Sequence, residues 1–387
     1  MLEKLDDIQW ERLKHAYGPA RDVPTNIRDL ASPDAEKSDK AMYNLYGNIF
    51  HQGSRYESTP YAIPFLWELI QEDTVRDKPG IIGLLVNLAL GYEDEYLPEG
   101  IDVQKFREDL LEREARMTND QRAYAEKYGY SNSALLECYT LVRDGVPLLY
   151  ECLESGDEEL SKAAVYAMAW FPELAETSVA RISSHLKRLE DEVAVSNAIL
   201  AIGLLARQSG LDEELLPVKA YLNSDSQLVK VCAAIALAGT PMEEAVLETL
   251  IEGLAVGEPL HYVEGMLFNE GRLSGYLSKV LSGCAIRERG KVISALSKAL
   301  ETANAYQALD LTRSLLSLIN ETRAVPLREA KRSALNASEV EALRAIYQHG
   351  GWTLGQGDFV NYLELLKAYG IPDSRTALAG YLALSDS

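Results

Sequence analysis

The sequence lacks the features that mark membrane, secreted and disulfide-stapled proteins. No apolar run reaches the roughly 18 residues that a membrane-spanning helix needs. The first residues, MLEKLDDIQW, are acidic and contain no apolar signal core, so we expect no secretory leader. Four cysteines occur, far apart, in or beside apolar segments, and none forms a CxxC pair: Cys138, Cys152, Cys232 and Cys284. Such cysteines are typical of buried free thiols, and we expect a cytoplasmic protein.

Basic residues are in short supply. The 387 residues include 38 Lys and Arg against 59 Asp and Glu, for a formal net charge of −21. Such a surface repels phosphate backbones, and no dense Lys/Arg run offers a local exception, so we expect no nucleic acid as a partner. Long-range attraction favours a basic protein or peptide instead.

Signatures of catalysis and of cofactor binding are also missing. The five histidines are too far apart for an HxxxH or HExxH metal motif, and no His-Glu dipeptide occurs. No GxSxG elbow, P-loop or dinucleotide fingerprint is present; GQGDFV lacks the third glycine. His261 and Glu264 can share a helix face as an acid–base pair, although a local hydrogen bond is the simpler interpretation. We therefore predict a non-enzymatic protein with no catalytic residue, no metal ligand and no cofactor.

Helical periodicity is what the sequence has in abundance. Met42, Leu45, Tyr46, Ile49 and Phe50 follow the i, i+3, i+4, i+7, i+8 spacing that lines one helix face. Similar segments start at Leu160, Val195 and Leu228, an interval of roughly 33–35 residues. Prolines precede or enter apolar helices at related intervals: Pro24, Pro64, Pro147, Pro217 and Pro326. This pattern predicts an all-α fold, an α-solenoid of stacked antiparallel helix pairs whose first helices are bent.

The repeats GVPLLYECLESGDEELSKAAVYAMAWF and ELLPVKAYLNSDSQLVKVCAAIALA resemble HEAT repeats. In both, an Asp precedes a Lys by five positions (Asp157 with Lys162, Asp225 with Lys230), and the resemblance implies structural ladders between repeats there. WERLKHAYGPARDVP followed by HQGSRYESTPYAIPFL is similar to the start of a bacterial HEAT-repeat group without a well-defined activity. The resemblance implies an armadillo-type superhelix and an interaction role.

Breaks in the periodicity suggest a division of this single solenoid. We expect N-terminal repeats over 1–92, a charged helical insertion over 93–130, central repeats over 131–350 that are irregular at 257–290, and a C-terminal cap over 351–387.

The stretch HQGS, at His51–Ser54, reads as a link between two helices. It predicts a helix that ends at Phe50, a left-handed Gly53, and Ser58 or Thr59 as the next N-cap. A binding role is the alternative, because turns of neighbouring repeats stack side by side. The candidate edge patch comprises His15, Tyr17, Arg21, His51, Gln52, Arg55 and Tyr56, which combine hydrogen bonding with rigid apolar area.

The sequence thus favours a scaffold or adaptor, of the inhibitor or immunity type among others, that holds a basic protein or peptide on a curved surface. Two enzymatic alternatives come from other HEAT-like proteins: a tetrapyrrole (phycobilin) lyase and a DNA glycosylase. A glycosylase needs a cationic concave face that this composition does not supply.

Overall fold

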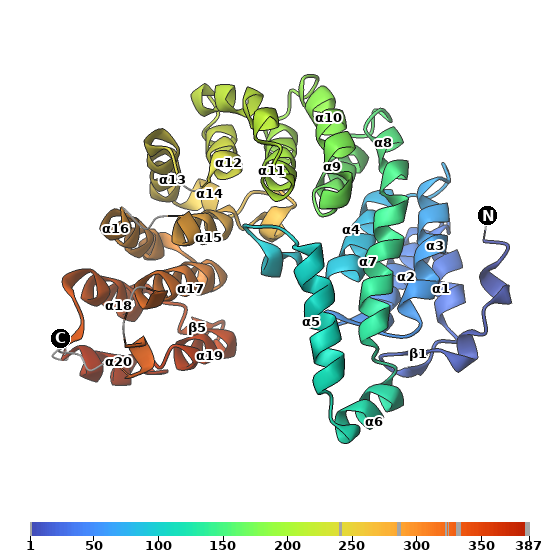
Figure 1. Ribbon diagram of the computed structural model, residues 1–387, viewed down its shortest axis with the longest axis horizontal. Coiled ribbons are helices and arrows are strands. Elements are labelled where there is room, and N and C mark those ends of the chain that lie inside the picture. The colour runs from blue at the N-terminus through green and yellow to red at the C-terminus, as the bar shows by residue number, and fades with distance from the viewer. Residues whose placement is uncertain are drawn as a thin grey trace. The chain divides into compact units, whose positions relative to one another are not determined.

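The computed structural model describes residues 2–239, 242–284, 288–321, 323, 325–329 and 334–383. The fold is all-α, as the sequence predicts: helices 1 to 20 follow one another through the chain, and the strands are pairs of residues (Figure 1). Within the described residues, no helix is both long enough and apolar enough to cross a membrane.

Side-chain caps begin many of the helices. Asp34 accepts hydrogen bonds from the backbone N–H groups of residues 36 and 37, and Asp157 accepts one from Leu160. Thr118 and Gln121 form a reciprocal capping box. These side chains satisfy N–H groups that have no partner inside the helix, and they fix where each helix starts.

The described residues divide into two compact units. The first runs to residue 188 and includes 204–211; the second comprises 189–203 and the described residues from 212 onward. The helices of the first are α1 (Val23–Leu30), α2 (Ala35–Asn48), α3 (Thr59–Ile70), α4 (Lys78–Leu90), α5 (Val103–Arg116), α6 (Asn119–Tyr128), α7 (Asn132–Gly145), α8 (Leu149–Cys152), α9 (Glu158–Met168) and α10 (Ala175–Leu186). Helix α11 (Glu192–Ser209) contributes to both units.

Helices of the first unit pack in two rows. Helix α1 contacts α3 and α3 contacts α7, while α2 contacts α4 and α4 contacts α9. Proline marks the bends: Pro64 lies inside α3, and Pro147 lies in a 3-10 turn (Val146–Leu148) between α7 and α8. The apolar faces of these helices are buried. In α4, for example, eight apolar residues from Ile81 to Leu90 are buried.

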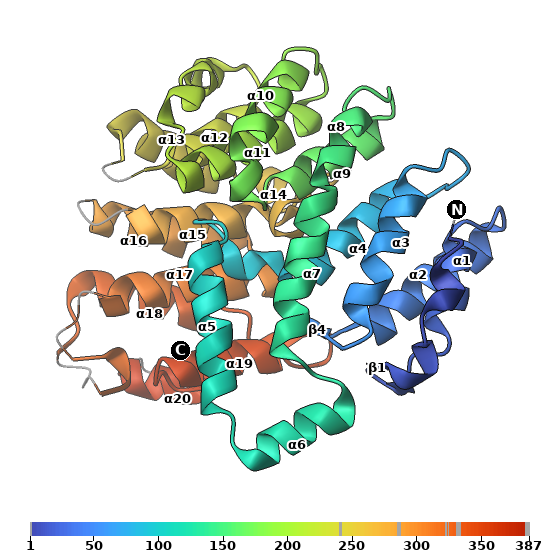
Figure 2. The same ribbon diagram turned by 45° about the vertical axis from the view of Figure 1, so that its right-hand side comes forward.

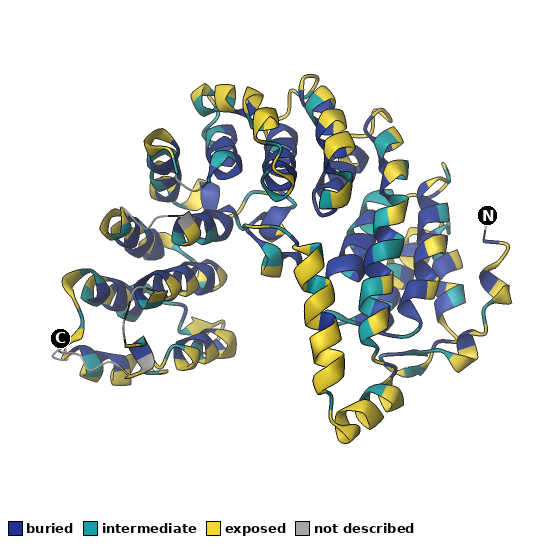
Figure 3. Ribbon diagram, viewed as in Figure 1, coloured by how far each residue is buried: buried dark blue, intermediate teal, exposed yellow. Residues whose placement is uncertain are grey.

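Helices α5 and α6 stand apart from these rows and are mostly exposed (Figure 3). Leu110 is the buried residue of α5, and α6 has none. Helix α5 packs against α7. Residues 93–130 therefore contain a short 3-10 helix at Glu93–Tyr96, followed by α5, α6 and their connections.

Three small antiparallel ribbons connect helices: β1 (Lys14–His15) with β2 (Gly18–Pro19), β3 (Phe50–His51) with β4 (Ser54–Arg55), and β5 (Thr353–Leu354) with β6 (Gly357–Asp358). The prediction of a helix that ends at Phe50 is therefore wrong: α2 ends at Asn48, and HQGS is a hairpin. Gln52 and Gly53 have φ of 50° and 77°, the positive pair that a tight hairpin turn requires. Gly53 is left-handed, as predicted.

The second unit contains α12 (Gln227–Leu237), α13 (Glu244–Val256), α14 (Glu258–His261), α15 (Leu273–Cys284), α16 (Arg289–Ala299), α17 (Ala305–Glu321), α18 (Ala337–His349), α19 (Val360–Ala368) and α20 (Arg375–Leu382). Contacts join α15 to α17 and α17 to α19, and also α16 to α18 and α18 to α20, so that two rows run side by side (Figure 1).

The predicted irregular stretch 257–290 includes a segment between α14 and α15 that belongs to neither row of helices. Asn269 and Glu270 have positive φ angles of 52° and 54°. Buried Asn197 holds the segment in place: its amide donates to the carbonyl of Gly265 at 3.1 Å and accepts from the N–H of Leu267 at 3.0 Å. Residues 285–287 of this stretch, and 384–387 of the predicted cap, lie outside the described residues.

Candidate functional site

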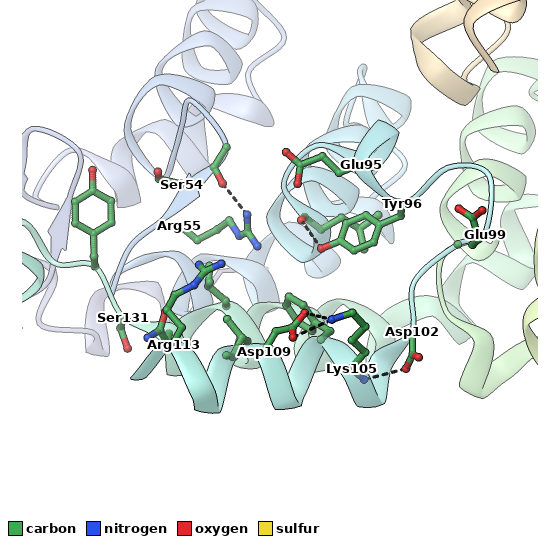
Figure 4. Close-up of a pocket in the computed structure, with 18 residues that line it drawn as sticks. Ser54, Arg55, Glu95, Tyr96, Glu99, Asp102, Lys105, Asp109, Arg113 and Ser131 are labelled. Atoms are coloured by element: carbon green, nitrogen blue, oxygen red, sulfur yellow. Dashed lines mark hydrogen bonds and ion pairs between the residues drawn. The ribbon is translucent and has the colours of Figure 1, made fainter. Parts of the chain in front are cut away.

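A cavity of about 690 Å³ lies in the first unit beside α5. Its walls come from the β3–β4 hairpin, from residues 95–102, from the inner face of α5 and from the start of α7 (Figure 4). The exposed helical segment 103–116 thus forms one wall of the cavity, opposite the hairpin.

Arg55 is the most unusual of the residues in this cavity. Its side chain is buried, with 7% of the residue exposed, and its guanidinium lies between the 95–96 segment and α5 (Figure 4). Nη1 donates to the carbonyl of Gly53 at 2.6 Å, whereas Nε has no hydrogen-bond partner among the described residues. No carboxylate of the described chain lies within ion-pair distance. Burial lowers the pKa of Arg55, because a desolvated guanidinium is less stable in its charged form.

Two glycines make room for this arginine and its hairpin. Gly91, at a φ of 90°, is so close that a Cβ there would lie 2.6 Å from Nη1 of Arg55. A Cβ at Gly53 would lie 2.7 Å from the ring of Tyr92. Both backbone positions are left-handed, where glycine is tolerated best. Gly91 therefore makes room for the guanidinium of Arg55, and Gly53 makes room for the ring of Tyr92 beside the hairpin turn.

Arg113 and Tyr96 accompany Arg55. Arg113 projects from α5 and makes no hydrogen bond or ion pair with the rest of the described chain; its positive charge contributes to the lowered pKa of Arg55. The hydroxyl of Tyr96 donates to the carbonyl of Leu90 at 3.4 Å. Burial raises the pKa of Tyr96, and the two arginines oppose that shift. Burial also raises the pKa of the nearby Cys138 thiol, which therefore stays protonated and unreactive at neutral pH.

Carboxylates and one lysine line the other end of the cavity (Figure 4). Lys105 Nζ contacts both carboxylate oxygens of Asp109, at 2.9 and 2.8 Å, which raises the pKa of Lys105. The side chain of Asp102 caps α5 by accepting from the N–H of Lys105. No ion pair within the described part of the chain engages Glu95 or Glu99. The cavity therefore contains both cations and carboxylates, with Glu95 close to the Arg55 guanidinium and Lys105 next to Asp109 (Figure 4). It is a setting for a ligand that carries charge.

The predicted edge patch is divided between the surface and the interior. Tyr17 and His51 meet as expected: their ring centroids are 5.3 Å apart, and the Tyr17 hydroxyl lies 3.3 Å from Nδ1 of His51. His15 is buried, and its Nε2 lies 2.7 Å from Asp22 while its Nδ1 accepts from the N–H of Tyr17. Arg21 and Gln52 are exposed.

Arg55 and Tyr56, the last two members of the predicted patch, point inward. Tyr56 is 1% exposed and packs on Tyr130, with ring centroids 5.0 Å apart and a backbone bridge between the two residues. The N–H of Glu57 also donates to the carbonyl of Gly129 at 2.8 Å. These contacts fasten the hairpin to the start of α7 and position Arg55 beside it.

Two of the predicted ladder residues, Asp157 and Lys162, contact groups of their own helix α9. Asp157 caps α9, and Lys162 pairs with Glu159 at 2.6 Å and with Glu158 at 3.7 Å. Asp225 is exposed, Lys230 is half-buried, and Ser226 is the residue that caps α12.

The prediction that His261 and Glu264 share a helix face is wrong. Helix α14 ends at His261, whose Nε2 lies 3.0 Å from the hydroxyl of Thr302 on the next row. Across the described residues, no group of three or more His, Cys, Asp or Glu side chains is placed to hold a metal ion.

Sequence reasoning named Arg55 but missed its companions Glu95, Tyr96 and Arg113. All three belong to the charged stretch at 93–130 that interrupts the repeats. A stretch that leaves the repeat pattern without a core of its own is a signal for a site, because its charged residues do little for stability.

No known family model matches the sequence, and no curated protein matches it. Among solved structures, a crystal structure of an engineered protein from the Northeast Structural Genomics Consortium is similar over 95% of both chains, at 15% sequence identity and a TM-score of 0.31.

Proposed function

We propose that this protein is a non-enzymatic binding scaffold of stacked, HEAT-like helix pairs that holds a basic protein or peptide. In the first unit α1 contacts α3 and α2 contacts α4; in the second, α16 contacts α18 and α18 contacts α20. Contacts of this kind between alternate helices support serial stacking of pairs. Such stacks offer long surfaces on which a partner segment can lie.

The observation that carries this proposal is the cavity beside α5. Four of its charged groups have no ion-pair partner among the described residues: the arginines Arg55 and Arg113 and the carboxylates Glu95 and Glu99. Groups left unpaired in a cavity of this size are available to a ligand. The free carboxylates receive basic side chains of the partner, and the net charge of −21 speeds its approach. A protein that inhibits a basic toxin fits the same chemistry.

Affinity capture from native lysate tests this function with two charge-matched variants. Glu95→Gln with Glu99→Gln removes two negative charges from the cavity. Glu108→Gln with Glu112→Gln removes two from α5 at positions that do not line it. Both variants lose the same net charge, but only the first changes residues that line the cavity; the control also loses the exposed ion pair between Glu112 and Arg116.

We expect the wild-type chain and the control to capture the same basic protein at low salt, with recovery that falls at high salt. The cavity variant should recover at least tenfold less, since it removes two contacts to desolvated cations. Capture of no specific protein at low salt, or equal recovery by both variants, would contradict the proposal.

A further inference from the structure

The arginine end of the cavity contains a buried guanidinium that has no ion-pair partner among the described residues; the charge of Glu95 acts on it from beyond ion-pair distance. Arg55 is more than nine-tenths buried, its Nε lacks a hydrogen-bond partner among the described residues, and its guanidinium lines the cavity. Buried charges are normally paired, because leaving them unpaired is costly. A buried arginine without an ion-pair partner is therefore expected to bind an anion.

A second feature at the same end also attracts negative charge. Helix α7, which has 14 residues, begins here, and Ser131, Asn132 and Leu135 line the cavity. The N-terminus of a helix carries partial positive charge and N–H groups that point outward. Arg113, which projects from α5, also lines the cavity.

We propose that this end of the cavity binds a carboxylate of the ligand, gripped between Arg55 and Arg113 beside the first turn of α7. The inference rests on the proposed binding function and names the group that the partner inserts. A guanidinium has a planar fork of N–H donors that matches the two oxygens of a carboxylate.

A carboxylate suits the cavity better than a phosphate. Cations and carboxylates line it in nearly equal numbers: Arg55, Lys105 and Arg113 against Glu95, Glu99, Asp102 and Asp109. A phosphate carries up to two negative charges at neutral pH, so the surrounding carboxylates repel it more strongly than they repel a singly charged carboxylate. The carboxylates at the far end also favour a ligand that carries a cation beyond its anionic group.

Three matched peptides and one inorganic ion test the site on the full-length protein at constant ionic strength. The peptides are N-acetyl-trialanine with a free C-terminus, the same peptide as an amide, and N-acetyl-Ala-Asp-Ala-amide; the ion is inorganic phosphate. Dissociation constants are measured by calorimetric or NMR titration. The first and third peptides separate a chain terminus from an acidic side chain as the source of the carboxylate.

We expect at least one carboxylate peptide to bind tenfold or more tightly than the neutral amide and more tightly than phosphate. Arg113→Gln should weaken that binding at least tenfold. Arg116→Gln should leave it unchanged, because Arg116 lies on the same helix, pairs with Glu112 and is absent from the cavity. Arg55→Lys should weaken binding too; if that variant fails to fold, Arg113→Gln still decides.

Equal binding of acid and amide, tighter binding of phosphate, or equal effects of Arg113→Gln and Arg116→Gln would each overturn the carboxylate site. These outcomes are separate from those of the capture experiment. If a carboxylate peptide binds but no protein is captured, the carboxylate site is supported and the scaffold function is contradicted. If a protein is captured but the peptides bind equally, the scaffold function is supported and the carboxylate site is contradicted.

Discussion

A single buried arginine illustrates a cost in stability at the cavity. Placing a guanidinium out of water costs several kcal/mol, and among the described residues the carbonyl of Gly53 accepts its one hydrogen bond. The backbone accommodates that side chain through Gly91, at a position where any other residue would collide with it. Departures from good local packing are expected at functional sites, and here the departure coincides with a cavity.

We expect His261 to make the stability of the second unit depend on pH. It is 2% exposed, its Nδ1 has no hydrogen-bond partner among the described residues, and burial lowers its pKa. Since the folded state resists protonation, the unfolded state takes up the proton first as pH falls below about 6.5. The free energy of unfolding should therefore be highest above that pH and should decrease as pH falls through it.

We expect His261→Gln to show a smaller loss of stability between pH 7.5 and pH 5.0 than the wild-type protein in urea titrations. His349→Gln, a change on a half-exposed residue, is the control and should keep the wild-type pH dependence. An identical pH dependence in wild type and His261→Gln would show that this side chain is not the group responsible.

Residue identities were easier to predict than residue environments. The sequence singled out Arg55 and Tyr56 as contact residues, but it placed them on an exposed edge with Tyr17. Their burial depends on Tyr130, which is far away in sequence and packs on Tyr56. A helical period says nothing about such a long-range pairing.

At the scale of elements, the β3–β4 hairpin is anchored by one hydroxyl. Thr59 Oγ1 accepts from the N–H of Tyr56 at 2.8 Å and donates to the carbonyl of Ile49 at 2.8 Å, all in the interior. The hydroxyl thereby ties both ends of the hairpin to the first turn of α3 and holds Arg55 in place.

Thr59→Val keeps the shape of the side chain but removes both hydrogen bonds. We expect it to lower the free energy of unfolding by about 2–4 kcal/mol, because a buried N–H and a buried carbonyl each lose a partner. Thr140→Val, which removes a bond to a carbonyl within its own helix, should cost less than about 1 kcal/mol. Chemical denaturation measures both, and equal losses would contradict the anchoring role.

The long helices could be predicted because their apolar spacing repeats over several turns. The ribbons could not, because two-residue strands are too short to display alternation. A charged helical insertion was expected over 93–130, yet no pattern within it indicates that it walls a cavity. That role follows from the packing of α5 on α7.

For the molecule as a whole, the excess of negative charge produces repulsion among like charges. Most ion pairs of the described chain are exposed, and such pairs contribute about 0–1 kcal/mol each. The excess of 21 negative charges acts over the entire chain and opposes the compact state.

We expect the melting temperature at pH 7.5 to rise between 20 and 200 mM NaCl, because screening weakens that repulsion more than it weakens the exposed pairs. Differential scanning calorimetry measures the shift, and KCl at equal ionic strength is the control for specific ion effects. A melting temperature that falls with salt would show that attractive pairs outweigh repulsion.

The order of helices in each unit was within reach of the sequence, but the division into two units was not. The periodic segments at 160–168, 195–203 and 228–236 look alike, although the unit boundary passes along α11. Side-chain volume helps to decide which contacts form within a unit. At Gly203, for example, the backbone of Ala236 approaches closely.

Helices α5 and α6 branch off after α4 and the chain returns at α7, yet α4 and α7 still touch each other (Figure 2). The contact between α4 and α7 forms without α5 and α6, and these two helices bury almost no apolar surface of their own. We therefore expect that changes in the length and charge of residues 103–128 alter the wall of the cavity while the contact between α4 and α7 is kept.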